Sequence, residues 1–176
     1  MFTVLVAPSE EVKQVGDYKR GAAKQRPEFK SVLEQFEDIA PSGFKIQYPK
    51  KPRTFCHIYP DHWPWAVHYE LLDYGENGYG VEIHLERKEV APLATLLQKF
   101  VGSLSVSDFP GATDLKWDPS WYRNRGRLII NVGADVEAHD VANAMTTLIL
   151  KTSKQIEREI EYLGLSVEQG DSEDQI

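Results

Sequence analysis

The stretch that decides the fold runs from Trp65 to Lys88 and reads WAVHYELLDYGENGYGVEIHLERK. Apolar and polar residues alternate in both halves of it, except that Ala66 and Leu72 take polar-face positions in the first half. The apolar set is Val67, Tyr69, Leu71, Val81, Ile83 and Leu85, and the polar set is His68, Glu70, Glu82, His84 and Glu86. Successive side chains of a β-strand point to opposite faces of the sheet. The stretch therefore predicts a β-hairpin with one apolar face on the core and one His/Glu face toward solvent.

The pairing register of this hairpin follows from the same alternation. The apolar positions of both strands have odd numbers, so the numbers of two opposed residues must add up to an even number. A two-residue turn at 77–78 fails this test, although Asn-Gly is a strong turn signal. Three-residue loops at 76–78 and at 75–77 both satisfy it, and Gly78 fits the left-handed position of the first. We expect the loop at 76–78.

The two allowed loops make different pairs on the polar face. The loop at 76–78 sets Glu70 opposite His84 and His68 opposite Glu86, whereas the loop at 75–77 sets His68 directly opposite His84. Opposed residues on a sheet face lie close enough to interact. The first register therefore predicts a ladder of His–Glu pairs.

The rest of the chain carries the signals of further helices and strands. We expect strands at 1–7, 44–48, 54–59, 114–118 and 127–132, and helices at 27–39, 92–104 and 135–163. Both early helices begin near a proline, and Gly164 follows the last one. This order predicts an α+β fold, an antiparallel sheet with helices packed on one face and a long C-terminal helix. We expect one domain over residues 1–165 and a disordered acidic tail over 166–176.

Composition restricts the class of protein. Hydrophobic residues make up 41% of the chain and charged residues 27%, as in an ordinary globular domain. No window approaches the roughly 18 uninterrupted apolar residues of a membrane span. The apolar N-terminal run has no basic residue ahead of it, so it is typical of a strand and not of a signal peptide. With Cys56 as the single cysteine, we expect a cytoplasmic protein without membrane contact.

The net charge of −7 argues against general nucleic-acid binding, because affinity for the phosphate backbone comes from cationic side chains. Local basic stretches lie at 19–30 and 45–53. They are either a solvated surface or a local contact with nucleic acid or an acidic partner.

The His/Glu face of the hairpin supports two interpretations. The first is charge pairing across the strands at the surface of the sheet. The second is a site formed by His68, Glu70, Glu82, His84 and Glu86, in which imidazoles and carboxylates bind a divalent ion or transfer protons. Its metal ligands would be Glu70, His84 and Glu86.

A second pattern points to metal-dependent chemistry. Pro60-Asp61 followed by Glu86-Arg87-Lys88 matches the PD…(D/E)xK pattern of metal-dependent nucleases. That chemistry needs two carboxylates on one Mg²⁺ or Mn²⁺ ion and a lysine beside the attacking water. Asp61, Glu86 and Lys88 would be the catalytic residues. Asp61, however, lies in a Pro-bracketed turn ahead of the strand, whereas the pattern places this residue on the strand itself.

An aromatic and basic turn is the remaining candidate surface. Trp121, Arg123 and Arg125 lie between the two last predicted strands. Trp and Arg are enriched where proteins bind one another. These residues either bind a partner or form an ordinary solvated turn.

The chain contains the short motifs His68-Tyr69-Glu70 and Glu82-Ile83-His84-Leu85-Glu86, and a helix, a Trp-bearing strand pair and a long helix follow them. This arrangement resembles a pattern in small bacterial and phage domains of unknown function. Some of those domains are similar to accessory domains of PD-(D/E)XK nucleases. The resemblance spans residues 60 to 163. It implies a prokaryotic or phage accessory module and no particular activity.

Two functional hypotheses follow. The first is a non-enzymatic interaction module with an unidentified protein partner, and it predicts an open, metal-free His/Glu face. The second is a nuclease-like phosphodiesterase that uses Mg²⁺ or Mn²⁺. It predicts that Asp61 or Glu70 lies within about 5 Å of Glu86, the separation at which charges couple strongly.

Overall fold

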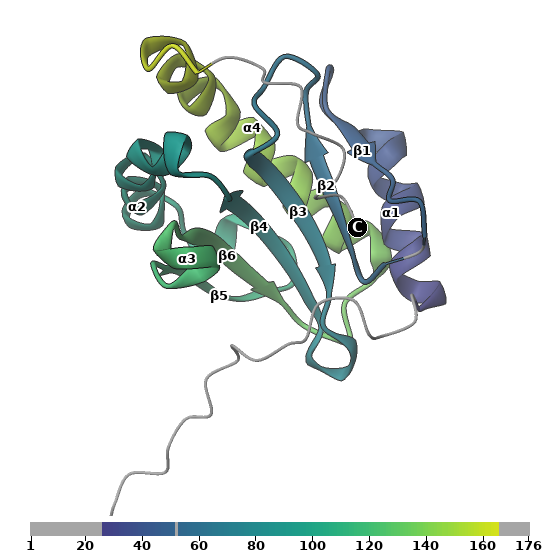
Figure 1. The fold of residues 1–176 in the computed structure, drawn as a ribbon. Helices are drawn as coiled ribbons and strands as arrows, with labels where there is room; N and C mark the ends of the chain where they lie inside the picture. Colours follow the sequence, from purple (N-terminus) through teal and green to yellow (C-terminus); the bar gives the residue numbers. More distant parts are fainter. Residues whose placement is uncertain (1–25, 52, 166–176) are drawn as a thin grey trace, which may run out of the picture.

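A six-stranded antiparallel sheet forms the centre of the molecule (Figure 1). The computed structural model describes residues 26–51 and 53–165. The strands are β1 (Lys45–Gln47), β2 (Phe55–Tyr59), β3 (Val67–Asp73), β4 (Tyr79–Leu85), β5 (Ala112–Asp118) and β6 (Arg127–Val132), in the order β1-β2-β3-β4-β6-β5. The expected strand at 1–7 and the expected tail at 166–176 lie outside the described residues.

The helices are α1 (Pro27–Ile39), α2 (Ala94–Ser103), the four-residue turn α3 (Trp121–Asn124) and α4 (Ala138–Tyr162), with short 3₁₀ turns η1 (Gly75–Asn77), η2 (Lys88–Leu93) and η3 (Val106–Asp108). The expected α+β fold with a long C-terminal helix is confirmed. In Figure 1, α1 and α4 lie behind the sheet. Among the described residues, no helix combines the length and the apolar character that a membrane crossing requires.

The core lies between one face of the sheet and the helices α1 and α4. The odd-numbered residues of the hairpin point into it, and Tyr69, Leu71 and Ile83 are all 0% exposed. The Tyr69 hydroxyl lies 2.8 Å from Thr152 Oγ1 on α4, so this buried phenol has a hydrogen-bond partner. The apolar face of the hairpin is therefore packed as the alternation predicted.

The hairpin register obeys the parity rule but differs from the expected one. His68 lies opposite His84 and Glu70 lies opposite Glu82. The loop is thus 75–77, which forms η1, and the expected loop at 76–78 is wrong. Gly78 belongs to the strand pair instead: it accepts a hydrogen bond from the Tyr74 backbone at 2.9 Å and has φ 92°.

The surroundings of the hairpin explain why this register forms. An added Cβ on Gly78 would lie 2.1 Å from the Val132 carbonyl oxygen, so only glycine lets β4 approach the end of β6 this closely. Gly75, with φ 65°, supplies the left-handed residue that starts the loop. Both glycines are needed at their places, and contact with β6 is a tertiary effect that the hairpin sequence does not contain.

The polar face of the hairpin is buried, and the expectation that it faces solvent is wrong. His68, Glu70, Glu82 and His84 are each 0% exposed. The hairpin lies at the centre of the sheet, with β2 on one side and β6 on the other. Same-face side chains of those strands therefore crowd it, and α3 packs on this face through Trp121.

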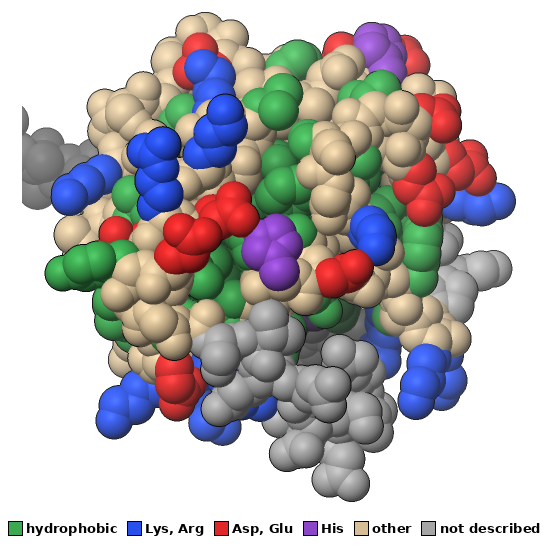
Figure 2. All heavy atoms as spheres, turned by 90° about the horizontal axis from the view of Figure 1, so that it is seen from above, with side chains coloured by type: hydrophobic (Ala, Val, Ile, Leu, Met, Phe, Trp, Pro, Cys, Tyr) green, Lys and Arg blue, Asp and Glu red, His purple; other side chains and the backbone are tan. Residues whose placement is uncertain are grey.

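Charged side chains at the surface are mixed in sign. Seen from above, acidic side chains lie interspersed with lysines and arginines (Figure 2). This face does not form the single basic surface that tracks a phosphate backbone.

Candidate metal centre

Two neighbouring strands bring four potential metal ligands together. His68 and Glu70 lie on β3, His84 lies on β4, and Glu86 follows the end of β4. The Glu86 backbone N–H still donates to the Ala66 carbonyl at 2.9 Å, so the strand pairing continues to this residue and holds its side chain on the same face. One ligand atom from each of the four residues lies within 4.8 Å of all the others.

Glu70 is the centre of this cluster. Its Oε2 lies 2.9 Å from His84 Nδ1 and 3.4 Å from His68 Nε2. Glu86 Oε1 lies 3.8 Å from the same two nitrogens. Two nitrogen and two oxygen donors thus lie close together, a set that suits first-row transition metals.

The outer nitrogens of both imidazoles have partners that set their orientation. His68 Nδ1 lies 2.8 Å from the Trp65 carbonyl oxygen, which only accepts, so Nδ1 carries a proton and Nε2 faces the cluster. His84 Nε2 lies 2.6 Å from Glu82 Oε2, so Nε2 donates and Nδ1 faces the cluster. Metal-binding histidines are usually fixed in this way, by a carbonyl or carboxylate on the far nitrogen.

Glu82 is in turn held by two donors. Arg127 on β6 donates to its Oε2 at 2.9 Å, and the Tyr74 hydroxyl donates to its Oε1. Arg127 also donates to Asp118 on β5 at 3.2 Å. The Glu82 carboxylate, which orients His84, is therefore held by a hydrogen-bond network that includes Arg127, Tyr74 and Asp118.

The carboxylates around His84 determine its protonation state. Burial alone would lower the pKa of His84, but the charge of Glu70 and hydrogen bonds to Glu70, Glu82 and Glu86 outweigh it and raise this pKa to about 10. In the metal-free protein His84 is thus an imidazolium between carboxylates. Burial lowers the pKa of neighbouring His57 to about 3, so His57 is neutral.

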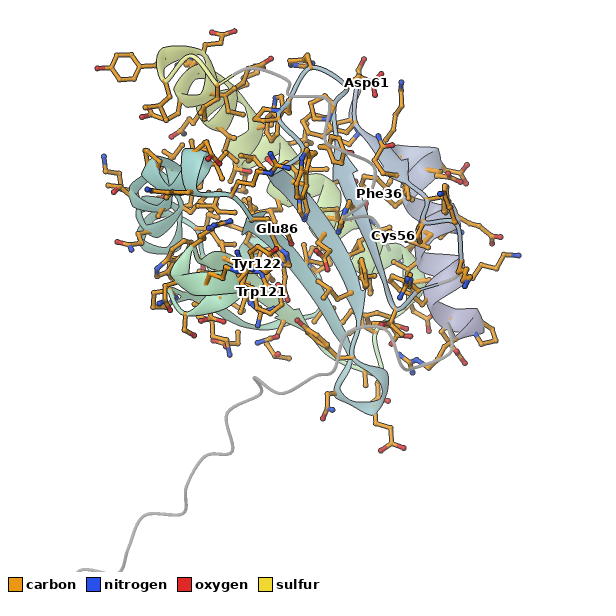
Figure 3. All side chains as sticks on the ribbon, in the orientation of Figure 1. Phe36, Cys56, Asp61, Glu86, Trp121 and Tyr122 are labelled. Carbon is orange, nitrogen blue, oxygen red and sulfur yellow. The ribbon has the colours of Figure 1, made fainter. Side chains whose placement is uncertain are left out.

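The turn α3 covers one side of the cluster. The Trp121 ring lies 5.2 Å from the His84 ring, and the Arg127 guanidinium lies 3.9 Å over Trp121. Arg125 donates to the Glu86 carbonyl. In Figure 3, Trp121, Tyr122 and Glu86 are labelled in the same part of the molecule.

This turn has an unusual backbone. Tyr122, Arg123 and Asn124 have φ values of 38°, 60° and 60°, in the left-handed region that non-glycine residues avoid. Each such residue costs about 1–3 kcal/mol, and such costs concentrate at functional sites. The contacts of Trp121 and Arg125 with the cluster are what this conformation provides.

The structure brings together only some of the residues expected from the sequence. Glu70, His84 and Glu86 form the cluster, and His68 joins them. Glu82 orients His84, Trp121 and Arg125 contact the cluster, and Arg123 is exposed. The expected separation of about 5 Å or less is met by Glu70 and Glu86.

Asp61 and Lys88 are not part of the cluster of His68, Glu70, His84 and Glu86. The Asp61 side chain is 73% exposed and pairs with Lys45 at 2.8 Å, whereas Glu86 is buried (Figure 3). Lys88 is exposed at the start of η2. The placement of Asp61 beside Lys45 does not provide the arrangement that the PD…ExK pattern requires.

One residue near the cluster was not predicted from the sequence. His57 on β2 lies opposite Glu70, and its Nε2 is 3.5 Å from Glu70 Oε2. The only sequence signal was its alternation with Cys56 and Ile58. Its proximity to Glu70 depends on the β2–β3 register, which the intervening turn does not specify.

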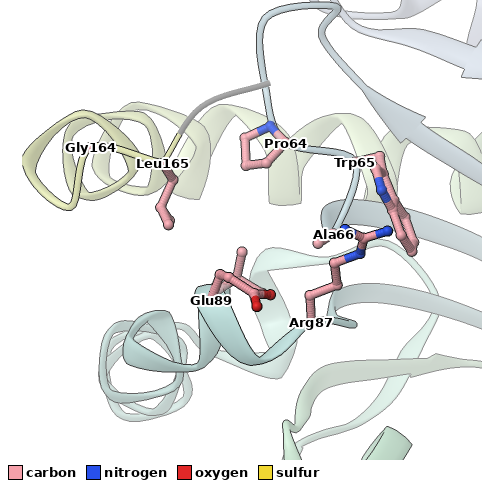
Figure 4. Close-up of a pocket in the computed structure, with 8 residues that line it drawn as sticks. Pro64, Trp65, Ala66, Arg87, Glu89, Gly164 and Leu165 are labelled. Carbon is pink, nitrogen blue, oxygen red and sulfur yellow. The ribbon is translucent and has the colours of Figure 1, made fainter. Parts of the chain in front are cut away.

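A pocket of about 200 Å³ lies between residues of the segments 64–66, 87–90 and 164–165 (Figure 4). Its lining includes Trp65, Ala66, Arg87 and Glu89, and the Arg87 guanidinium lies 5.0 Å over the Trp65 ring. The carbonyl of Trp65 faces His68, and that of Ala66 accepts from Glu86. The pocket wall is therefore continuous with the backbone that holds two of the ligands.

Comparisons with protein-family models, curated proteins and solved structures gave no match. The resemblance to bacterial and phage accessory domains stays a prediction.

Proposed function

We propose that this protein binds one divalent first-row transition-metal ion through His68, Glu70, His84 and Glu86. The observation that carries this proposal is the convergence of four buried donor atoms within 4.8 Å of one another. The fixed far nitrogens of His68 and His84 support it, because they leave the ligating nitrogens facing the cluster.

Charge supports the same conclusion. Buried carboxylates are costly unless a cation neutralises them. The carboxylates of Glu70 and Glu86 would together match the charge of a divalent ion, and Glu82 beside them already has Arg127 as a cationic partner. Binding then displaces the proton of His84, as ligation of an imidazole requires.

The chemistry that such an ion supplies is that of a Lewis acid, which polarises a bound oxygen group or activates water. The interaction module predicts an open His/Glu face, but this face is buried. The burial therefore favours the metal-dependent hypothesis. Of the nuclease-like set, the proposal retains Glu86 and replaces Asp61 by Glu70. A role for Trp121, Arg123 and Arg125 toward a protein partner stays a prediction.

The test is metal binding by the full chain. The protein is treated with a chelator, and binding of Mn²⁺, Co²⁺ and Zn²⁺ is measured by titration calorimetry, with the bound metal determined by mass spectrometry. We expect one ion per chain. Glu70→Gln and His84→Gln should each weaken binding by on the order of 100-fold or more, since each removes a ligand.

Two controls separate ligation from general damage. Tyr69→Phe alters a buried residue of β3 on the opposite face, and Asp61→Asn alters the exposed carboxylate of the PD…ExK pattern. Both should bind metal as the wild type does. Absence of binding by wild type, or unchanged affinity in Glu70→Gln, would refute the proposal.

A further inference from the structure

His57 carries a buried nitrogen for which the described part of the chain provides no hydrogen bond. Its Nε2 is inaccessible to solvent and has no hydrogen-bond partner among residues 26–51 and 53–165. Buried polar atoms are nearly always satisfied, so an exception needs an explanation. Glu70 Oε2 lies 3.5 Å from this nitrogen, and the same oxygen lies 2.9 Å from His84 Nδ1 in the candidate metal centre.

The His57 ring is held in a stack. It lies 4.1 Å from the His68 ring at an interplanar angle of 30°, and 5.5 Å from the Phe55 ring at 31°. The stack brings His57 alongside a ligand of the centre, and the β2–β3 pairing places it directly opposite Glu70. Backbone and side-chain contacts thus both fix this imidazole beside the cluster.

We propose that His57 is a fifth protein ligand of the metal centre, which leaves one exchangeable position on a six-coordinate ion. This inference rests on the proposed function. Five nitrogen and oxygen ligands fit Mn²⁺, Fe²⁺, Co²⁺ or Ni²⁺ better than the closed four-ligand arrangement of structural zinc. The remaining position takes water or one small anionic oxygen or nitrogen donor.

The alternative is that His57 only packs beside the cluster. In that case its loss changes stability but leaves the ion's coordination as it was. The two cases differ in the number of nitrogens bound to the metal, and this number is measurable on the protein with Co²⁺ as the probe.

The first experiment compares Co²⁺ complexes of the wild type and His57→Phe, which keeps an aromatic ring in the stack. Six-coordinate Co²⁺ has weak visible absorption bands that become several-fold stronger as the coordination number falls. We expect weak bands in the wild type, stronger bands in His57→Phe and an affinity at least about tenfold lower. Azide should bind to one position in the wild type and to two in the variant.

His62→Gln is the matched control. His62 is an exposed histidine that pairs with Glu157 at 2.6 Å, so this variant should keep the wild-type spectrum. A second measurement needs no variant: the proton NMR spectrum of the Co²⁺ protein should contain three strongly shifted, exchangeable imidazole N–H signals. Two such signals, or an unchanged spectrum and affinity in His57→Phe, would overturn the role of His57 while leaving metal binding intact. A wild type that binds no Co²⁺ would overturn both proposals.

Discussion

His84 Nδ1 lies 2.9 Å from Glu70 Oε2, across the two central strands of the sheet and out of contact with solvent. The other nitrogen of the same ring lies 2.6 Å from Glu82. One imidazole is therefore held between two buried carboxylates, and its protonation is coupled both to folding and to metal binding.

The metal-free protein should lose stability as the pH rises from about 6.5 to about 10. The pKa of His84 is raised to about 10 in the folded state, against an ordinary value of 6.5. Below 6.5 both states hold the proton and the stabilisation is complete. Above it only the folded state does, so stability falls until the folded pKa is passed. Urea unfolding of chelator-treated protein across this range measures the trend.

His84→Gln is the control for this pH dependence. It should be less stable than the wild type at pH 6 and should lose less stability between pH 6.5 and 10. Saturation with metal should also flatten the wild-type trend, because the ligated imidazole no longer carries the displaced proton. Identical pH profiles for the wild type and His84→Gln would contradict the assignment.

Trp121 should report metal binding by fluorescence. Its ring lies 5.2 Å from the His84 ring, a distance at which Co²⁺ or Cu²⁺ quenches indole emission efficiently. We expect saturable quenching in the wild type and loss of a large share of it in Trp121→Phe. Trp63→Phe, which alters a core tryptophan packed 5.9 Å from Tyr69, should keep most of the quenching. Equal quenching in Trp121→Phe and wild type would argue against an ion at His84.

Gly78→Ala should destabilise the protein much more than Gly43→Ala. Both glycines have a left-handed φ, 92° and 87°, so both substitutions incur the backbone cost of about 1 kcal/mol. A Cβ at position 43 meets no atom within 4 Å, whereas one at position 78 meets the Val132 carbonyl at 2.1 Å. We expect a loss of about 3 kcal/mol or more for Gly78→Ala. Denaturant unfolding measures both, and equal losses would mean that the β4–β6 approach is not as close as described.

The alternation of residues 65–88 was enough to predict the hairpin and its two faces. Periodicity of 2 can be read locally, since each side chain's face depends only on its own position in the strand. The same holds for α4, whose buried stripe, including Val141, Met145 and Leu148, repeats at helical spacing. The α+β class followed from these local signals.

Three further features could not be read in this way. The register of the hairpin depended on the contact of Gly78 with Val132, from a strand about 50 residues away in the chain. The neighbourhood of His57 depended on how β2 pairs with β3. The left-handed turn at 122–124 has no glycine at those positions, and its conformation accompanies contacts of Trp121 and Arg125 with the cluster.

The sequence by itself determined that two imidazoles and three carboxylates share one face of a hairpin, because alternation along a strand is a local property. Only the tertiary structure decided that this face is buried. Neighbouring strands β2 and β6 add His57 and Arg127 to it, and α3 adds Trp121. Burial strengthens every charge interaction within the face, since water no longer screens it. That change in environment turns a row of surface pairs into a candidate metal centre.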